Sequence, residues 1–429
     1  MLQAVFFAFT TRLGLPPDET YHLSYIKLFS ENNFSPFLSN QEGYFSLGEA
    51  VRTPFFLYHY LLSFPYSLSD NFVFMRLINV ALGVGSLVLV ALIAGELKVP
   101  KLVRNLSIFM AANTLMLVFL AGSVSYDNLF IVLSLSSILL AIRLFNKITA
   151  THLLLLVACL AAGSLVKINF LPLAAALMII LAVRYHQSYK SVWAAFQKTF
   201  AAHRRVNMAL CVLVAFLSVL VLHRYGYNVV KYRTYAPACT QVQSLEQCRQ
   251  HALFVRNETV LGRDHPKPDK DPFEYVYDWI PLIQDRTFGI YGHQDFTPIR
   301  IVRASIQILI VLAAAAVIRA WRKKDRLFSL LIGISLFYTF MLLLENYDIY
   351  TRSGRMGFVV HGRHMLAVLP VLYIIGNHYM LKVASNLYVK TGLVLMIIAI
   401  FAASSLPTYA IKANKTWLNP PSARLLRKP

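Results

Sequence analysis

Charged side chains are scarce in this sequence: they make up 14% of its 429 residues, whereas hydrophobic residues make up 57%. This balance excludes an ordinary soluble domain, in which about 25% of the residues are charged. The hydrophobic residues recur in runs of about 20, the length that a helix needs to cross a lipid bilayer. The runs also lack the strict alternation of a transmembrane β-barrel strand. The sequence therefore predicts an all-α polytopic membrane protein.

Acidic residues are the rarer charge, with 20 Asp and Glu against 41 Lys and Arg, and the formal net charge is +21. The basic residues lie mainly in short connections between hydrophobic runs and do not form a separate basic domain. Cytoplasmic loops of membrane proteins, which face anionic lipid, have this pattern. We therefore expect membrane lipids, and not nucleic acid, as the partner of these charges.

Cysteine is rare as well, with four residues in the chain. Cys159 and Cys211 lie inside hydrophobic runs and are interpreted as inert core residues. Cys239 and Cys248 lie in the one long polar loop, and their spacing does not resemble a paired zinc-binding motif. A disulfide between these two is expected if the loop faces an oxidising compartment.

About eleven membrane-spanning helices are expected. The first hydrophobic segment, Met1 to Leu13, is too short for a full span, and we interpret it as the remnant of a longer helix. The other spans are expected near residues 71–96, 105–122, 127–145, 152–167, 170–184, 207–223, 299–320, 327–344, 364–381 and 391–410.

Three regions between the spans have their own organisation. The first outer loop, 15–54, is rich in aromatic residues and is expected to form interfacial helices. The basic amphipathic stretch 184–205 is typical of a helix on the cytoplasmic surface. The loop 224–298 is expected to fold into a small extracytoplasmic unit, between an N-terminal transmembrane catalytic module, 1–223, and C-terminal transmembrane helices with a tail, 299–429. The core predicted for this loop comprises Phe273, Tyr275, Tyr277, Trp279 and Ile280.

The basic connections set a single orientation. Connections rich in Lys and Arg are expected on the cytoplasmic side, at 98–104, 143–147, 184–205 and 319–326. The remaining connections then lie outside, at 15–54, 123–127, 167–169, 224–298 and 345–363. The basic C-terminal tail is the one exception to this pattern.

The first outer loop opens with a motif that contains two acids and an imidazole. Pro16 and Pro17 suit the start of a helix, where a missing N–H costs nothing. Asp18 and His22 are four residues apart, so a helix places them on one face, with Glu19 beside them. Such a group suits a general base, a metal site or a proton path. Alternatively, the two acids simply favour the positive end of the helix dipole.

More charged groups are expected on the same outer face, at the ends of spans, where a charge is costly unless it is solvated or used. Acids there suit catalytic bases or metal ligands, and Arg and Lys suit the binding of a phosphate. Simpler roles are also open: helix capping for Asp127, snorkelling for Lys167, a surface cation for Arg52, and anchoring of a span for Arg363 and His364. The outer-face set is Asp18, Glu19, His22, Arg52, Asp127, Lys167, Asp348, Arg352, Arg355, His361, Arg363 and His364.

The coincidence of these groups on one face favours a functional site. An outward-facing site has no access to cytoplasmic nucleotides. A group donor for such a site must therefore be carried by the membrane, and a lipid-phosphate carrier is the natural candidate.

Several motifs resemble one family, in the same order along the chain. Pro17-Asp18-Glu19-x-x-His22 resembles the first outer-loop acidic motif of the GT-C superfamily of integral-membrane glycosyltransferases. The segment Arg76 to Gly83 looks like the opening of the second span in these enzymes. Ser125-Tyr126-Asp127 resembles their second outer-loop acid, and Gly163-Ser164-Leu165-Val166-Lys167 resembles the lysine-bearing segment after it.

A fifth motif resembles a bacterial family of predicted membrane proteins that is grouped with these enzymes. His361-Gly362-Arg363-His364 and the following residues to Pro370 are similar to its Q-G-R-Y-x-x-P-x-x-P pattern. His361, His364 and Ala367 replace the Gln, the Tyr and the first Pro of that pattern. This resemblance implies a multi-pass protein of the bacterial inner membrane with its active site on the extracytoplasmic side.

The resemblance to GT-C enzymes implies transfer of a sugar, with inversion, from a polyprenyl-phosphate carrier to an envelope glycan, lipid or protein. Asp18 would be the base or a metal-linked acid, and Asp127 the second acid. No cofactor is certain, and a divalent metal, if one is used, would bind to Asp18 and Asp127. The catalytic candidates are Asp18, Glu19 and Asp127, and the substrate-binding candidates are His22, Arg52, Lys167, Arg363 and His364.

Two other functions remain open, a transporter or flippase of lipid-linked sugars and a polymerase or ligase of surface polysaccharide. A transporter typically has charged positions near the middle of the membrane and paired repeats. Here the polar residues gather at one face, and the sequence shows no clear internal repeat. The early acidic motif favours the glycosyltransferase over both alternatives.

Overall fold

The computed structural model describes residues 1–37, 52–251, 254–255, 258, 268–291, 297–321, 325–413 and 415–418. These residues form helices and connections, and the β-structure among them is a single isolated bridge between Thr11 and Leu418. The prediction of an all-α chain is therefore confirmed. Part of the first outer loop, 38–51, lies outside the described residues. The described part contains the helix α2, and its location at the membrane interface stays a prediction.

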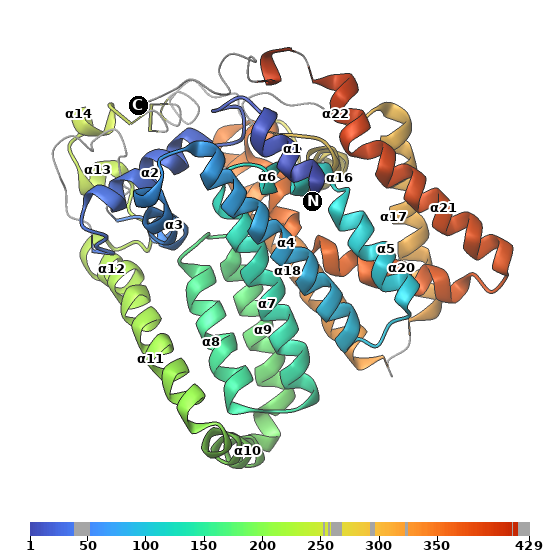
Figure 1. Cartoon of the computed structure of the whole chain (residues 1–429), viewed down its shortest axis with the longest axis horizontal. Coiled ribbons are helices and arrows are strands. Elements are labelled where there is room, and N and C mark those ends of the chain that lie inside the picture. Colours follow the sequence, from blue (N-terminus) through green and yellow to red (C-terminus); the bar gives the residue numbers. More distant parts are fainter. Residues whose placement is uncertain are drawn as a thin grey trace.

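The N-terminal half runs from α1 to α10 (Figure 1). Its helices are α1 (Leu2–Thr10), α2 (Glu19–Glu31), α3 (Leu57–Leu68), α4 (Phe72–Glu96), α5 (Lys101–Ala112), α6 (Leu115–Ala121), α7 (Tyr126–Asn146), α8 (Ala150–Ser164), α9 (Phe170–Tyr185), η2 (His186–Ser188) and α10 (Tyr189–Ala202).

The C-terminal half begins with α11, which packs against α8. Its helices are α11 (Arg204–Val221), η3 (Leu222–Gly226), α12 (Tyr227–Tyr232), α13 (Cys239–Val242), α14 (Leu245–Cys248), α16 (Pro272–Phe288), α17 (Arg300–Ala320), α18 (Arg326–Ser353), α19 (Met356–Val359), η4 (Gly362–Ala367), α20 (Leu369–Val383), α21 (Leu387–Ser404), α22 (Leu406–Lys412) and η5 (Lys415–Trp417).

The expected number of membrane spans was wrong. Within the described residues, seven helical stretches are long and apolar enough to cross a membrane, or eight if α5 and α6 form one span bent by 65°. The sequence predicted about eleven because α1, α8 and α20 are apolar. However, α1 has 9 residues, and α8 and α20 have 15 each. At about 1.5 Å per residue these helices fall short of a hydrocarbon core of about 30 Å.

The basic stretch 184–205 contains an exposed helix, α10, and its place on the membrane surface stays a prediction. None of the residues of α10 is buried, and Figure 1 shows it at the lower end of the bundle, seen nearly along its axis. Thr199 fixes it there, because its Oγ1 accepts a hydrogen bond from the backbone N–H of Ala150 at 2.9 Å. The predicted cytoplasmic location of this end stays a prediction.

The region 224–298 is less independent than the sequence predicted. Tyr275 and Trp279 of α16 are buried, but their neighbours Leu342 and Tyr350 belong to α18. The other residues of the expected core, Phe273, Tyr277 and Ile280, are 86%, 80% and 56% exposed. That part of the prediction is wrong, because only one face of α16 packs on the transmembrane helices.

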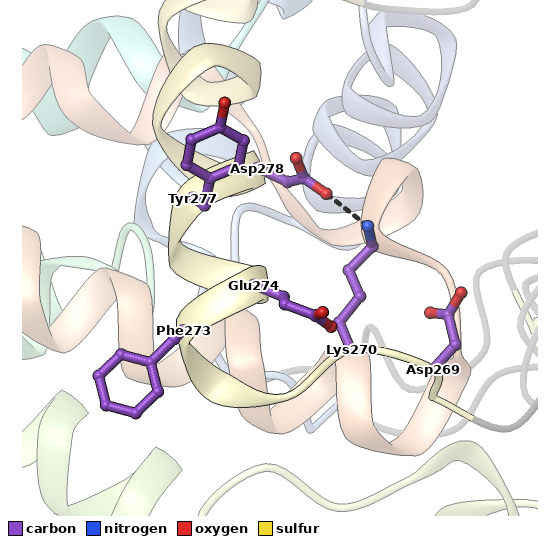
Figure 2. A pocket seen from close by; sticks show the side chains of 6 residues that line it. All are labelled: Asp269, Lys270, Phe273, Glu274, Tyr277 and Asp278. Atoms are coloured by element: carbon purple, nitrogen blue, oxygen red, sulfur yellow. Dashed lines mark hydrogen bonds and ion pairs between the residues drawn. The ribbon is translucent and has the colours of Figure 1, made fainter.

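A small open cavity lies beside the N-terminal half of α16 (Figure 2). Lys270 and Asp278 form an ion pair at its edge, and Phe273, Glu274 and Tyr277 of α16 also line it. The hydroxyl of Tyr350 donates to Asp269 at 2.8 Å. The polar groups of this cavity are thus largely engaged with one another.

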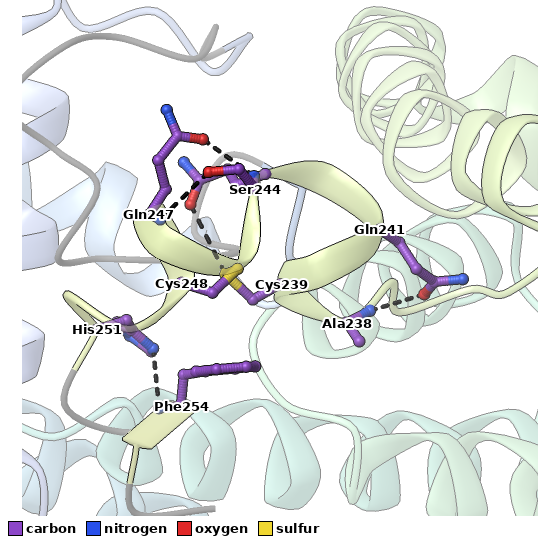
Figure 3. Close-up of a disulfide and its surroundings, with 9 residues drawn as sticks. Ala238, Cys239, Gln241, Ser244, Gln247, Cys248, His251 and Phe254 are labelled. Carbon is purple, nitrogen blue, oxygen red and sulfur yellow. Dashed lines mark hydrogen bonds between the residues drawn. A yellow bond between two sulfur atoms is a disulfide. The ribbon is translucent and has the colours of Figure 1, made fainter. Parts of the chain in front are cut away.

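The expected disulfide is present. Cys239 and Cys248 are bonded and join α13 to α14 (Figure 3). A capping box between Ser244 and Gln247 opens α14, which ends at Cys248. Cys159 and Cys211 are free and only partly buried, so they are not fully enclosed core residues as the sequence predicted.

Candidate functional site

Asp18 stands just before α2 in an unusual backbone conformation. Its φ of 57° and ψ of 14° are left-handed, which is uncommon for a residue other than glycine. The helix begins at Glu19, one residue later than the prolines suggest. His22 nevertheless lies one turn beyond Asp18, since its N–H donates to the Asp18 carbonyl at 2.9 Å. The Asp18 side chain does not cap the helix and is 22% exposed.

Glu19 is fully buried and paired with Arg76 of α4. The guanidinium donates from Nε to Glu19 Oε1 at 2.8 Å and from Nη2 to Oε2 at 2.6 Å. Arg76 Nη1 donates in addition to the carbonyls of Ala8 and Thr11. The backbone N–H of Val124 also donates to Glu19 at 3.0 Å. Glu19 therefore connects α1, α2, α4 and the approach to α7, which suits a positioning role for this carboxylate.

Asp127 lies in the first turn of α7 and is fully buried. Its helix is capped by Ser125, whose Oγ accepts from the Asp127 N–H. The carboxylate of Asp127 instead forms an ion pair with Lys167, from the link between α8 and α9. The ammonium of Lys167 is 3% exposed and lies 4.8 Å from the centre of the Tyr126 ring. The Asp127 carboxylate therefore does not cap the helix, and the Lys167 side chain does not extend into water.

Arg363 brings the two acids together from the C-terminal half. Its Nη2 lies 3.1 Å from Asp18 Oδ2, and its Nη1 lies 3.7 Å from Asp127 Oδ2. The side chain is only 8% exposed. Gly362 permits this placement, because a Cβ there would meet the backbone of Arg286 at 2.1 Å. Within the described part of the chain, Nε and Nη1 of Arg363 have no hydrogen-bond acceptor.

Four imidazoles complete the cluster. His22 Nδ1 lies 2.9 Å from His59 Nε2, and His364 Nδ1 lies 3.5 Å from the Asn169 amide. His361 lies next to His364, with ring centres 5.3 Å apart. Burial lowers the pKa of His22 to about 4 and the pKa of His361 and His364 well below the usual value. These rings are therefore neutral at pH 7 and can donate or accept a hydrogen bond.

Burial also lowers the pKa of Lys167, to about 8, and the neighbouring Asp127 limits that fall. Lys167 thus keeps its charge at neutral pH. The described cluster holds two cations, Lys167 and Arg363, against Asp18 and Asp127. Glu345 of α18 also interacts with the charge of Lys167. An incoming anion must therefore compete with carboxylates for the two cations.

Six of the predicted site residues meet here, and Glu19 lies directly beside them. Arg52 is placed differently: its guanidinium lies 4.4 Å from the centre of the Tyr227 ring, and its carbonyl accepts from Asn228. The six residues that meet are Asp18, His22, Asp127, Lys167, Arg363 and His364.

The sequence interpretation missed two contributors. His59 hydrogen-bonds to His22, and Glu345 of α18 accepts from Asn169 at 3.0 Å. The sequence feature that could have identified His59 is its imidazole, which stands alone in the apolar segment Phe55 to Leu62. Neither residue belongs to a recognisable motif, because its role depends on a neighbour far away in the sequence.

The described residues contain no group of three or more His, Cys, Asp or Glu side chains arranged to hold a metal ion. Asp18 and Asp127, the expected metal ligands, both face the guanidinium of Arg363. The Arg363 guanidinium therefore already occupies the position between these two carboxylates.

Acidification is expected to destabilise the protein through His22. Asp18 and Asp127 raise its pKa and Arg363 and Lys167 lower it, but burial dominates and gives about 4. Between pH 6.5 and about 4 the unfolded chain binds a proton that the folded chain does not, so the free energy of unfolding falls by up to about 3 kcal/mol as the pH drops. Above pH 6.5 this contribution is constant.

Unfolding of the detergent-purified protein, followed by intrinsic fluorescence at a series of pH values, measures this effect. His22→Gln should give a shallower acid slope than the wild type, and exposed His186→Gln should not change the slope. Equal slopes for His22→Gln and the wild type would contradict the prediction.

A protein-family model matches part of the chain. A family model described as "Predicted membrane protein (DUF2142)" matches residues 64–265. The match includes Arg76, Asp127 and Lys167 but not Asp18 or Arg363. A search of curated proteins finds no match. Together with the candidate spans, the family match identifies a multi-pass membrane protein.

Proposed function

We propose that this protein is a GT-C-type glycosyltransferase of the bacterial inner membrane. It would transfer a sugar from a polyprenyl-phosphate carrier to an envelope glycan, lipid or protein on the extracytoplasmic face. The observation that carries the proposal is the meeting of Asp18, Asp127, Lys167 and Arg363 from four separate segments of the chain. Two acids and two buried cations match what transfer from a lipid phosphate requires.

Asp18 is the best candidate for the general base. Its side chain is 22% exposed, whereas Asp127 is fully buried and paired with Lys167. In the proposed reaction, Asp18 takes the proton of the acceptor hydroxyl while that oxygen bonds to the anomeric carbon of the sugar. The bond from this carbon to the carrier oxygen breaks, and the phosphate leaves with the electron pair. Attack opposite the leaving group inverts the anomeric carbon.

Arg363 is the best candidate for the group that receives the phosphate. The two guanidinium nitrogens without an acceptor are buried donors, and such donors are costly to leave unsatisfied. A phosphate that binds to them would satisfy these donors and gain stabilisation as negative charge develops on it. Lys167 would add a second cation, held in place by Asp127.

The remaining candidates take supporting roles in this proposal. Glu19 fixes the start of α2 through Arg76 and so positions Asp18. Neutral His22 and His364 offer hydrogen bonds to sugar or acceptor hydroxyls. Arg52, which stacks on Tyr227, would contact the carrier only at the margin of the site.

Arg363→Gln is expected to raise the KM for the polyprenyl-phosphate sugar about tenfold to a hundredfold, with a smaller effect on the KM for the acceptor. The amide keeps hydrogen-bonding capacity but removes the charge that faces the phosphate. The measurement is transfer of radiolabelled sugar in proteoliposomes. Arg352→Gln is the matched control, because Arg352 is 65% exposed and pairs with Asp348 on the surface. An unchanged donor KM for Arg363→Gln would argue against phosphate binding.

A transporter or flippase of lipid-linked sugars remains the second candidate. The buried Asp127–Lys167 pair favours it to some degree, since ionisable pairs inside helical bundles also mark transport paths. The same proteoliposomes separate the two functions. Sugar-lipid that crosses the bilayer without transfer to any acceptor would support the transporter. A polysaccharide polymerase or ligase would instead be recognised by acceptors that grow by whole repeat units.

A further inference from the structure

The helices α11, η3 and α12 follow one another without a break and form one candidate span, Arg204–Tyr232, of 29 residues. At about 1.5 Å per residue this span is about 43 Å long, which matches the thickness of about 40–45 Å of a bilayer with its headgroups. Both ends of the span therefore reach the level of the lipid headgroups when the span crosses a bilayer.

This span is also the one least covered by protein among the candidate spans of the described residues. Of its most apolar window 17% is buried, against 22% to 67% in the others, and Figure 1 shows α11 at the edge of the bundle beside α8. Large apolar side chains along it are 46% to 75% exposed, namely Val212, Phe216, Val219, Leu222 and Val230. An exposed apolar surface of this kind suits the acyl chains of a lipid.

Two cations meet at the α12 end of the span, around the ring of Tyr227. The guanidinium of Arg52, which comes from the segment before α3, lies 4.4 Å from the centre of this ring. Lys231 Nζ lies 5.4 Å from the same centre. The backbone of Arg52 is held there, because Asn228 Nδ2 donates to its carbonyl at 2.9 Å. Arg52 is therefore placed by a contact between distant segments and does not simply extend from the span toward water.

These two cations lack a described counter-charge. The ion pairs between described residues include neither Arg52 nor Lys231. The sequence has no Asp or Glu between Asp127 and Glu246, so the span itself offers no carboxylate. Nη1 of Arg52 is buried and has no acceptor among the described residues. A buried donor without an acceptor is costly, and an anion would satisfy both the donor and the charge.

The position of the two cations indicates which anion fits. A phosphate at headgroup level can bind to a guanidinium through paired N–H groups and to an ammonium as a point charge. The exposed apolar side chains of α11 lie along the same span, where the acyl chains of that lipid would run. Arg224 and Arg233 add positive charge to the same end of the helix. A headgroup with its own ammonium is repelled by these cations, so a headgroup with a net negative charge is favoured.

We propose that Arg52 and Lys231, placed around Tyr227, bind the phosphate of an anionic phospholipid whose acyl chains lie along the exposed face of α11. This site is separate from Arg363, which receives the carrier phosphate in the proposed reaction. The inference does not rest on sugar transfer. It gives Arg52 a ligand of its own at the surface between protein and lipid.

Native mass spectrometry of the full-length, detergent-purified protein tests the site. Phosphatidylglycerol and phosphatidylethanolamine with identical acyl chains are titrated in turn. The wild type should bind its first phosphatidylglycerol about tenfold more tightly than phosphatidylethanolamine. Arg52→Gln and Lys231→Gln should each raise the Kd for that first phosphatidylglycerol about tenfold. Arg352→Gln is the control of equal charge, because it removes a cation that is 65% exposed and pairs with Asp348.

Lys231 is exposed, so Lys231→Gln is expected to fold even if Arg52→Gln does not. Thermal unfolding of each variant without added lipid checks this. Equal phosphatidylglycerol binding by the wild type and Lys231→Gln would overturn the proposal, and so would equal binding of the two phospholipids by the wild type. Polyprenyl phosphate is titrated as a third lipid. If Lys231→Gln weakens the binding of polyprenyl phosphate and leaves that of phosphatidylglycerol unchanged, the site belongs to the carrier and the phospholipid assignment is wrong.

Discussion

Asp18→Asn is expected to lower sugar transfer at least about a hundredfold, since a positioned general base typically contributes that much or more. An amide cannot take the proton of the acceptor hydroxyl. Folding should survive the change, because Asn tolerates the left-handed conformation of residue 18 as well as Asp does. The Asn oxygen can also still accept from Arg363, which lies 3.1 Å from the present carboxylate. The measurement is single-turnover transfer in proteoliposomes with a radiolabelled polyprenyl-phosphate sugar.

Two further variants make this result specific. Asp348→Asn removes a carboxylate that is 67% exposed and paired with Arg352, and it should transfer sugar at the wild-type rate. Asp18→Glu keeps a base at a displaced position and should retain more activity than Asp18→Asn. If Asp18→Asn is as active as the wild type, Asp18 is not the base, and Asp127 becomes the carboxylate to test.

Arg76→Met is expected to have the largest effect on stability, a loss of about 3–5 kcal/mol in the free energy of unfolding. It leaves the Glu19 carboxylate buried without a counter-charge, since both side chains are 0% exposed. It also removes the donors to the carbonyls of Ala8 and Thr11, which hold the end of α1. Denaturant unfolding of the detergent-purified protein measures the loss.

The control for this prediction is the pair between Arg143 and Glu96, which is 34% and 30% exposed. Arg143→Met should cost at most about 1 kcal/mol, because solvent already screens that pair. Adding Glu19→Gln to Arg76→Met should restore part of the stability, since it removes the isolated charge. Equal losses for Arg76→Met and Arg143→Met would show that burial of the Glu19 pair contributes little.

The order of the polar motifs along the chain was enough to predict much of the candidate site. Hydropathy separates helices from connections, and the basic connections assign alternate connections to the same end of the bundle. Asp18, Asp127, Lys167 and Arg363 could therefore be placed together although up to 345 residues separate two of them. This holds for Asp127 at the start of α7, Lys167 before α9 and Arg363 after α18, each next to a candidate span, whereas α1, before Asp18, is too short to be one.

Hydropathy was a poor guide to how many helices span the membrane. Helix α20 is apolar, but it is a 15-residue helix buried mainly against other helices. A segment that packs inside the protein and a segment that faces lipid need the same apolar side chains. Length and the burial of each face distinguish them, and these become visible only when the helix ends are fixed.

The sequence by itself predicted the all-α membrane class, a disulfide that depends on an oxidising compartment, and the meeting of most of the candidate site residues. Only the tertiary structure decided which partner each charged group takes. Glu19 looked like a catalytic acid beside Asp18, but Arg76 of another helix binds it; His59 belonged to no motif, but it lies against His22. The physical reason is that a span fixes the level of a residue in the membrane, whereas an ion pair or hydrogen bond forms within about 3 Å and depends on how each helix is rotated and packed.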